Sequence, residues 1–202
     1  MNEARFNLPI QAPITYHVDL YRYWLSKRGL RRMPSRSDID PADIPRLLPY
    51  VGMVEKVDDE FRYRLAGTAL VQQFGRDFTG KTLGSELSDK PEAVQAMRAI
   101  ARHIFAAGHP AFITGEYETK FGNIHNASAL ALPLSDDDNA TNVVIFTRLA
   151  RFSLGTRPAP DWLKGAPLTI RDVSHIQNAI DLERRCLDWE RLCYPVSKSL
   201  SA

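Results

Sequence analysis

Hydrophobic and polar side chains alternate over residues 61–67, which places Phe61, Tyr63 and Leu65 on one side of the chain. This period of two is typical of a half-buried β-strand. The preceding run at residues 50–57 is rich in valine and indicates a second strand, and the short acidic segment between the two runs supplies a turn. The pattern therefore predicts an antiparallel β-hairpin.

Two helices are predicted after the hairpin. Residues 69–74 supply a short helix that Gly75 ends, and residues 89–107 form the longest helix of the core. Asp89 and Glu92 have the spacing of a capping box at its start. The apolar stripe of this longer helix consists of Val94, Met97, Ala101, Ile104 and Phe105.

Three further strand-like runs follow at residues 111–119, 124–132 and 142–150. Short polar segments connect them, and loops of this length favour hairpins. The three runs therefore predict an antiparallel meander. The order of two strands, helices and three strands indicates a compact α+β core.

An amphipathic helix precedes the core and ends at Gly29. Its apolar side chains are Val18, Leu20, Tyr21, Trp24 and Leu25. Further along, Asp40 is suited to cap a short helix that has Pro41 in its first turn. Because Trp24 is too large and apolar to remain exposed, we expect the first helix to be part of the folded unit.

The tail combines a linker rich in proline and glycine, at residues 155–167, with a partly helical pattern at residues 173–192. The apolar positions of that pattern are Val173, Ile176, Ile180, Leu187 and Trp189. Two arrangements fit it: the helix packs back on its own core, or it contacts a second copy or another protein. The chain divides into an N-terminal helical lead-in at 1–49, a core at 50–150, and a linker with a C-terminal helix at 151–202.

The strand and short helices at residues 61–83 resemble part of the PAS domain family. The upstream segment is similar to the lead-in of a stand-alone bacterial PAS subfamily, at Trp24, residues 27–29, Pro34, Arg36, residues 38–41 and residues 48–49. The resemblance covers residues 16–150. It implies an α+β fold with a five-stranded antiparallel sheet, helices over one face of the sheet, and a sensory role.

In PAS domains the second strand leads into short helices that wall a small-molecule cavity. This resemblance and the alternation along the strands together predict residues near such a cavity: Tyr63, Leu65, Phe74, Ile104, Phe112, Ser128 and Ile145. Ordinary core packing is the competing interpretation for each apolar member. The ligand itself is not implied.

Charge and composition narrow the class of protein. A chain of 202 residues that is 44% hydrophobic can bury one good core, and a net charge of +2 provides no global field for nucleic acid or membranes. No window approaches the ~20 apolar residues of a membrane span. Cys186 and Cys193 both lie in the tail, and no N-terminal run resembles a signal peptide. We therefore expect a reduced, cytoplasmic protein without a nucleic-acid partner.

The cofactor chemistries of better-understood PAS branches find little support. Flavin photosensors use a cysteine inside the core, whereas both cysteines here follow Phe152. Haem sensors place a histidine on the long helix, where His103 lies. His103 falls beside the apolar stripe and not clearly on it, so we interpret it as a polar or boundary residue. No cofactor is assigned.

Other polar clusters are less informative. Residues 136–139 lack the ligand spacing, glycine and closing glutamate of an EF-hand, so they indicate an acidic turn. Arg32 and Arg36, taken with residues 126–128, only faintly resemble the two-part phosphate site of cyclic-dinucleotide receptors. The basic cluster at residues 27–36 is typical of a solvated surface or a docking patch. Neither a metal site nor a catalytic constellation is predicted.

The sequence therefore predicts a PAS-like sensory or regulatory domain that binds a small apolar or amphipathic molecule. Its signal would pass through dimerisation or docking of a protein partner. The alternative is a ligand-free interaction or dimerisation scaffold with the same fold. A third alternative, an enzyme built on an α+β cone, would need convergent polar residues in its cavity, and the sequence reveals none.

Overall fold

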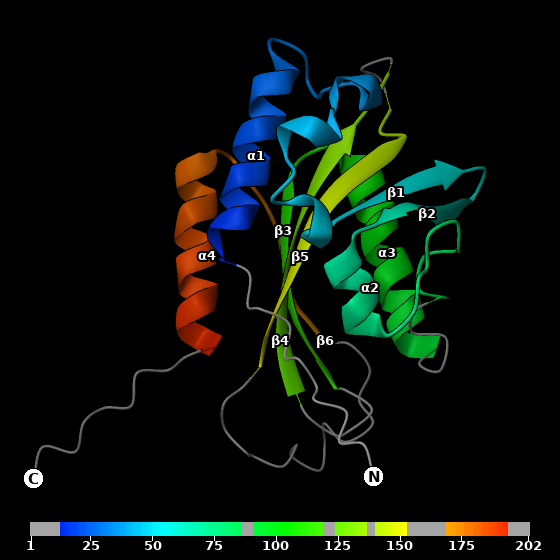
Figure 1. The fold of residues 1–202 in the computed structure, drawn as a ribbon, viewed down its shortest axis with the longest axis vertical. Coiled ribbons are helices and arrows are strands. Elements are labelled where there is room, and N and C mark those ends of the chain that lie inside the picture. The colour runs from blue at the N-terminus through cyan, green and yellow to red at the C-terminus, as the bar shows by residue number, and fades with distance from the viewer. Residues whose placement is uncertain (1–12, 86–90, 119–123, 137–139, 153–168, 194–202) are drawn as a thin grey trace, which may run out of the picture.

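One antiparallel sheet organises the molecule (Figure 1). The computed structural model describes residues 13–85, 91–118, 124–136, 140–152 and 169–193. Within these ranges the sheet has six strands in the order β2-β1-β5-β4-β3-β6. No helix in the described ranges combines the length and the apolar character that crossing a membrane requires.

The predicted hairpin and meander are both confirmed. The hairpin pairs β1 (Val51–Val57) with β2 (Glu60–Ala66), and β1 joins the meander by pairing with β5. The meander strands are β3 (Ala111–Glu118), β4 (Ile124–Leu134) and β5 (Val143–Phe152). A sixth strand, β6 (Thr169–His175), extends the sheet beyond the five that were expected.

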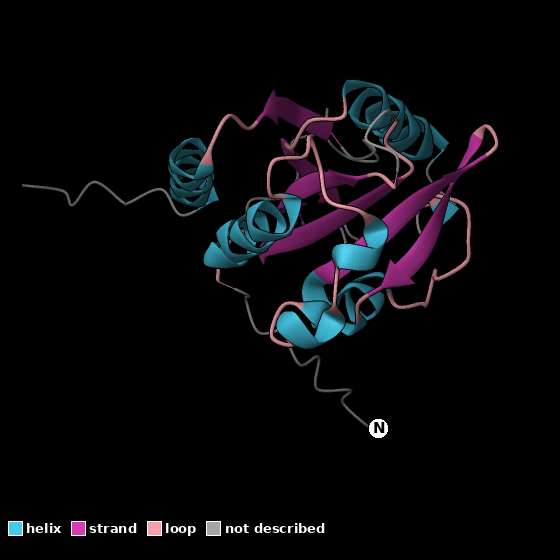
Figure 2. Ribbon diagram, turned by 90° about the horizontal axis from the view of Figure 1, so that it is seen from above, coloured by secondary structure: helices cyan, strands magenta, loops and turns pink. Residues whose placement is uncertain are grey.

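Helices cover both faces of the sheet, whereas the resemblance implied helices over one face only (Figures 1 and 2). One face carries α1 (Thr15–Arg28) and α4 (Ala179–Cys193). The other carries α2 (Thr68–Phe74) and α3 (Pro91–Ala107). Each face therefore has its own hydrophobic core. Asp89 of the expected capping box lies outside the described residues.

The lead-in is part of the folded unit, as the size of Trp24 predicted. The Trp24 side chain is 1% exposed, and its indole N–H donates a hydrogen bond of 2.8 Å to the carbonyl of Pro133 at the end of β4. Helix α1 ends at Gly29, whose φ of 58° lies in the left-handed region that favours glycine. As predicted, Asp40 caps the short turn that begins at Pro41, because its side chain accepts from the amide of Ala42.

Three 3₁₀ turns connect α1 to the sheet. They are η1 (Arg36–Asp38), η2 (Pro41–Asp43) and η3 (Leu48–Tyr50). Ile39 and Ile44, which follow the first two turns, are both buried in the core beneath α1. The connection is thus packed against the sheet along its length.

The tail differs from its prediction in two ways. Val173 was expected on the helix, but it lies in β6, and α4 begins only at Ala179. The face that α4 buries is also different, because Ile180 and Leu187 are exposed at 78% and 52%. The stripe that packs toward α1 consists of Leu182, Cys186, Trp189 and Cys193. Of the two arrangements that the sequence left open, the structure shows the helix packed on its own domain.

The start of α4 is fixed by a reciprocal pair of hydrogen bonds. The Asn178 side chain accepts from the amide of Asp181, and the Asp181 carboxylate accepts from the amide of Gln177. Burial would raise the pKa of Asp181, but hydrogen bonds from Arg184, Gln177 and Arg185 outweigh it and lower the pKa. The ionised Asp181 therefore stabilises the fold near neutral pH, and this stabilisation is lost as the pH falls through the lowered pKa.

The two cysteines of α4 are free and buried. Burial raises the pKa of Cys186 to about 12, and the nearby carboxylates of Glu190 and Glu183 act in the same direction. The thiol is therefore protonated at neutral pH and is a poor nucleophile. The folded state favours the protonated thiol. The free energy of unfolding therefore falls as the pH rises from the ordinary pKa of a thiol toward the raised pKa.

Replacing Trp24 by phenylalanine tests how α1 is anchored. The variant keeps an aromatic ring but leaves the buried Pro133 carbonyl without its indole donor. We expect the free energy of unfolding in urea to fall by about 1–3 kcal/mol. Leu30→Ala, at a fully exposed position, is the control and should change it by less than about 0.5 kcal/mol. Equal effects of the two substitutions would contradict this anchoring role.

Candidate functional site

A cavity lies between the sheet and the two helices α2 and α3. Its volume, counted as space open to the centres of water-sized molecules, is about 160 Å³. A single water needs only ~10–15 Å³ on that scale, so the cavity can hold a small molecule. We call it the α3-side cavity. Its walls come from all five strands of the predicted core, from both helices, and from the segment between them.

Small residues on β3 and β4 form the floor of the α3-side cavity. Gly115 lies on β3, and Ala127, Ala129 and Ala131 occupy alternate positions of β4. Alternate residues of a strand share one face, so these three alanines point toward α3. Larger side chains at these positions would fill the space.

Aromatic side chains form the opposite wall. The Tyr63 and Phe78 rings pack edge to face with centroids 4.5 Å apart, and Phe74 meets Phe78 in the same way at 5.6 Å. Phe146 reaches the cavity from β5, directly opposite Gly52 of β1. A Cβ atom at position 52 would stand 2.3 Å from the Phe146 ring, so only glycine lets the ring take this place.

Arg148 supplies the charge at this mainly apolar site. Its guanidinium donates a hydrogen bond to the side-chain oxygen of Gln73 and lies 4.8 Å from the centre of the Phe74 ring. Arg148 thereby links β5 to α2 at the wall of the cavity. A largely apolar cavity with one cation at its edge suits an apolar or amphipathic molecule better than a polar one.

The structure brings four of the seven sequence-predicted site residues to this cavity. Tyr63, Phe74 and Ile104 line it, and Ser128 belongs to the strand segment that forms its floor. The Ser128 hydroxyl, however, contacts the opposite side of the sheet, 2.9 Å from Nε2 of the buried His17. Whether these residues bind a ligand stays a prediction.

Leu65 lies on the opposite face because β2 is irregular. Met53 pairs with Leu65 and Val54 pairs with Tyr63, so the register shifts and Arg64 has no partner of its own in β1. This β-bulge breaks the simple alternation that placed Tyr63 and Leu65 on one side. Leu65 packs against the core beneath α1.

Phe112 and Ile145 also belong to the core beneath α1. Phe112 packs edge to face against His17, with ring centroids 5.6 Å apart. Sequence reasoning missed Phe78 and Leu83, which lie in an irregular segment without periodicity. It also passed over the alanines of β4, whose small size is the signal that could have identified the floor.

The remaining polar candidates lie elsewhere. His103 is exposed on α3, with its ring centroid 5.4 Å from that of His175, and it does not line the α3-side cavity. Within the described ranges, His, Cys, Asp and Glu form no group of three or more that could hold a metal ion. Arg32 donates to the carbonyl of Ala107, whereas the Ser128 hydroxyl contacts His17, so these two halves of the suggested phosphate site have different partners.

The sequence pattern that defines the PAS domain family matches residues 15–146, which is more than half of the chain. The chain therefore belongs to the PAS domain family, a family of sensory and regulatory domains. No curated protein sequence matches the chain.

Several solved structures are similar to part of this chain. The PAS domain of Bordetella pertussis BvgS is 17% identical and covers 76% of this chain and 99% of its own, with a TM-score of 0.43. The Rhodobacter sphaeroides LOV protein is 15% identical over 59% of this chain and 70% of its own, with a TM-score of 0.42. Vibrio cholerae VqmA, in a complex with ligand and DNA, is 16% identical over 54% of this chain, with a TM-score of 0.44. This chain spans about half of that protein, 49%.

Gly52→Ala tests the packing of the aromatic wall. The added methyl group would displace the Phe146 ring, and we expect a loss of about 1–3 kcal/mol in the free energy of unfolding. In a Phe146→Leu background the same substitution should cost clearly less, because the ring is gone. Urea unfolding of the four proteins in this cycle measures the coupling, and strictly additive effects would refute the proposed contact.

Proposed function

We propose that the chain is a sensory domain whose α3-side cavity binds a small apolar or amphipathic molecule. The observation that carries this proposal is the cavity itself, which is formed by the sheet, α2 and α3 and is lined by side chains that are nearly all apolar. Arg148 at its wall would interact with a polar end of the molecule. The aromatic residues Tyr63, Phe74 and Phe78 would pack against its apolar part.

The energetics of apolar burial support this proposal. Nearly all side chains that line the cavity are apolar, and removing apolar surface from water contributes about 25 cal/mol per Å². A ligand that covers this surface and binds only the folded state would stabilise the fold.

The domain organisation is proposed on the same grounds. The core at 50–150 would hold the ligand, while the lead-in at 1–49 and the tail at 151–202 would carry the output. In support, α1 and α4 pack together on the face of the sheet that lies away from the cavity, and an ion pair of 2.6 Å joins Arg22 to Glu183.

Association through α4 is the proposed form of output. Ile180, Leu187 and Leu192 are exposed at 78%, 52% and 71%, although the same helix buries five other residues. Such side chains are suited to contact a second copy or another protein. A ligand-free scaffold that uses only this surface is the second candidate function.

Native mass spectrometry of gently purified protein, together with an indole titration, tests ligand binding. We expect a retained small-molecule mass, and saturating indole as a neutral aromatic probe should raise the melting temperature. Ala129→Phe, which fills the cavity floor, should abolish both effects, whereas Ala99→Phe on the exposed face of α3 should keep them. A wild-type protein that shows neither effect would favour the scaffold.

Light scattering at matched concentrations tests the output. If α4 mediates association, the wild-type chain should be larger than a monomer, and Ile180→Glu with Leu187→Glu should yield a monomer. Leu30→Glu introduces the same charge at a fully exposed leucine outside α4, and we expect it to leave the oligomeric state unchanged. An assembly that persists in the α4 variant would assign association to another surface.

A further inference from the structure

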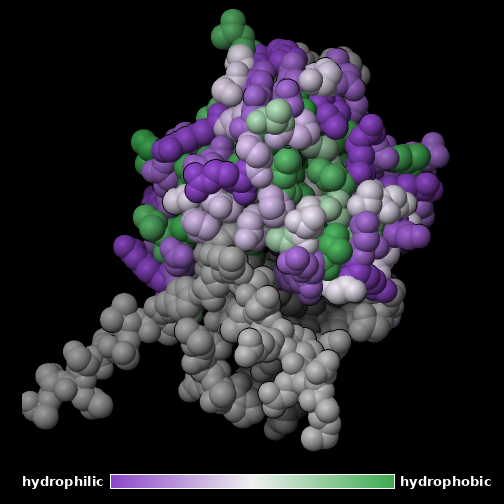
Figure 3. Space-filling model, in the orientation of Figure 1, coloured by the Kyte–Doolittle hydropathy of each residue, from purple (hydrophilic) through white to green (hydrophobic). Residues whose placement is uncertain are grey.

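A second cavity lies on the α1 side of the sheet, between the 3₁₀ turns and the first hairpin. Its volume on the same scale is about 180 Å³, and it shares no lining residue with the α3-side cavity. We call it the η-turn cavity. Its apolar lining consists of Ile39, Pro41, Ile44, Leu48, Val51, Met53 and Leu65. On the face seen in Figure 3, hydrophobic residues gather near the middle of the molecule and hydrophilic residues surround them.

Two arginines complete the lining of the η-turn cavity, and they differ in charge balance. Arg64 forms an ion pair of 2.6 Å with Glu55, so its charge is compensated. Arg36 is half-buried, and its Nε is fully buried without an acceptor in the described part of the chain. Within the described residues its side chain makes one long hydrogen bond, of 3.5 Å, from Nη1 to the carbonyl of Ile39. Among the described residues no carboxylate forms an ion pair with Arg36, so its uncompensated charge at the cavity favours an anionic partner.

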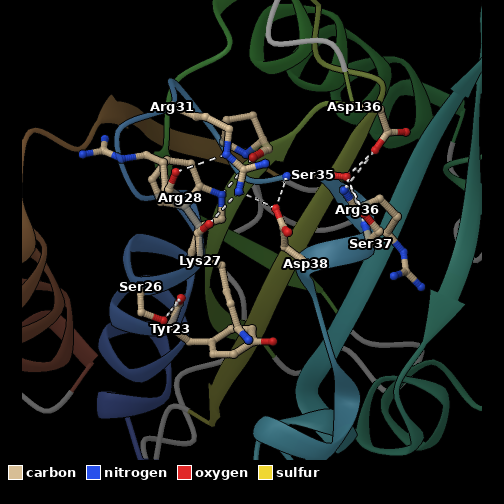
Figure 4. Close-up of polar contacts among 12 residues, drawn as sticks. Tyr23, Ser26, Lys27, Arg28, Arg31, Ser35, Arg36, Ser37, Asp38 and Asp136 are labelled. Atoms are coloured by element: carbon tan, nitrogen blue, oxygen red, sulfur yellow. Dashed lines mark hydrogen bonds and ion pairs between the residues drawn. The ribbon is translucent and has the colours of Figure 1, made fainter.

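The backbone around Arg36 is held on both sides (Figure 4). Asp38 accepts from the amide of Ser35 at 2.8 Å and pairs with Arg31 at 2.6 Å. Asp136 accepts from the Ser35 hydroxyl and from the amide of Arg36. The hydrogen bond from the Ser35 amide lowers the pKa of Asp38, and Arg31 adds to this effect.

These contacts involve the main chain and the neighbours of Arg36. Its own side chain lines the η-turn cavity. In Figure 4 the Arg36 side chain extends away from the contacts to Asp136 and toward the strands of the hairpin. The Arg36 position is therefore fixed before any ligand arrives, which reduces the entropy lost on binding.

We propose that the η-turn cavity binds a monocarboxylate with a short alkyl chain. The carboxylate would accept from the two terminal nitrogens of Arg36, in the two-bond geometry that arginine offers to carboxylates. The alkyl chain would lie against Ile44, Leu48 and Met53. Apart from Arg36, the only polar side chain of the lining is Arg64, whose charge Glu55 already compensates, so the lining favours an alkyl tail over a sugar or a nucleobase.

This site is independent of the proposed function, because its ligand enters from the other face of the sheet. Calorimetric titration of the full chain with octanoate, with octan-1-ol as the neutral analogue, tests it. We expect octanoate to bind, and octan-1-ol to bind at least about tenfold more weakly because it lacks the charge. Equal affinity for the two would overturn the role of Arg36.

Matched variants locate the octanoate. Arg36→Met removes the charge but keeps an unbranched side chain, and it should weaken octanoate binding by about tenfold or more. Arg46→Met makes the same charge change at a nearby exposed arginine and should leave the affinity unchanged. Leu65→Phe reduces the space without altering charge, so it should also weaken binding and serves if Arg36→Met fails to fold.

Ala129→Phe separates the two sites. It fills the α3-side cavity, so octanoate binding should persist in this variant even if indole binding is lost. Octanoate binding that is lost in Ala129→Phe but kept in Arg36→Met would assign the acid to the α3-side cavity and overturn the proposal. Inorganic phosphate that displaces octanoate at equal concentration would likewise overturn it, because the alkyl chain would then contribute nothing.

Discussion

Burial of both faces of one antiparallel sheet is the constraint on which the rest of the structure depends. Neighbouring residues of a strand point to opposite faces, so each central strand serves two environments. In β4, Ala127 and Ala129 line the α3-side cavity, while the hydroxyl of Ser128 between them contacts His17 of α1. The wall of the cavity and the docking surface of α1 are therefore made from alternate residues of the same strand.

His17 shows how closely α1 is bound to that sheet. The ring has no exposed surface, and its two nitrogens lie 2.6 Å from the Thr147 hydroxyl and 2.9 Å from the Ser128 hydroxyl. A hydroxyl can donate or accept, so either neutral tautomer of the ring is satisfied. Rotation or translation of α1 would break these bonds and leave buried polar groups unpaired. Helix α1 therefore has one favourable position on β4 and β5, and a movement of these strands is also a movement of α1.

The local pattern of the sequence was sufficient for the hairpin, the meander and the long helix, because each has its own period and its own turn residues. The same pattern was not sufficient to predict which residues line the cavity. Phe112 and Ile145 alternate correctly, but alternation cannot say which of two buried faces borders a cavity. The prediction that Leu65 lines the same cavity as Tyr63 failed for a different reason, because the bulge at Arg64 moves Leu65 to the other face. The start of the tail was misassigned because Val173 completes a strand only through pairing with β3, a partner far away in the sequence.

Alternation along β1 places the two cavities on opposite sides of one strand. Met53 lines the η-turn cavity and Val54, the next residue of β1, lines the α3-side cavity. β1 also pairs with β5, which contributes Phe146 and Arg148 to the α3-side wall. A ligand in either cavity therefore contacts a strand that forms part of the other. If occupancy of one site shifts β1, the affinity of the second site must change, and thermodynamic linkage requires the reverse effect to be equal. The free energy that couples the sites would be carried by this strand, without any contact between the two ligands.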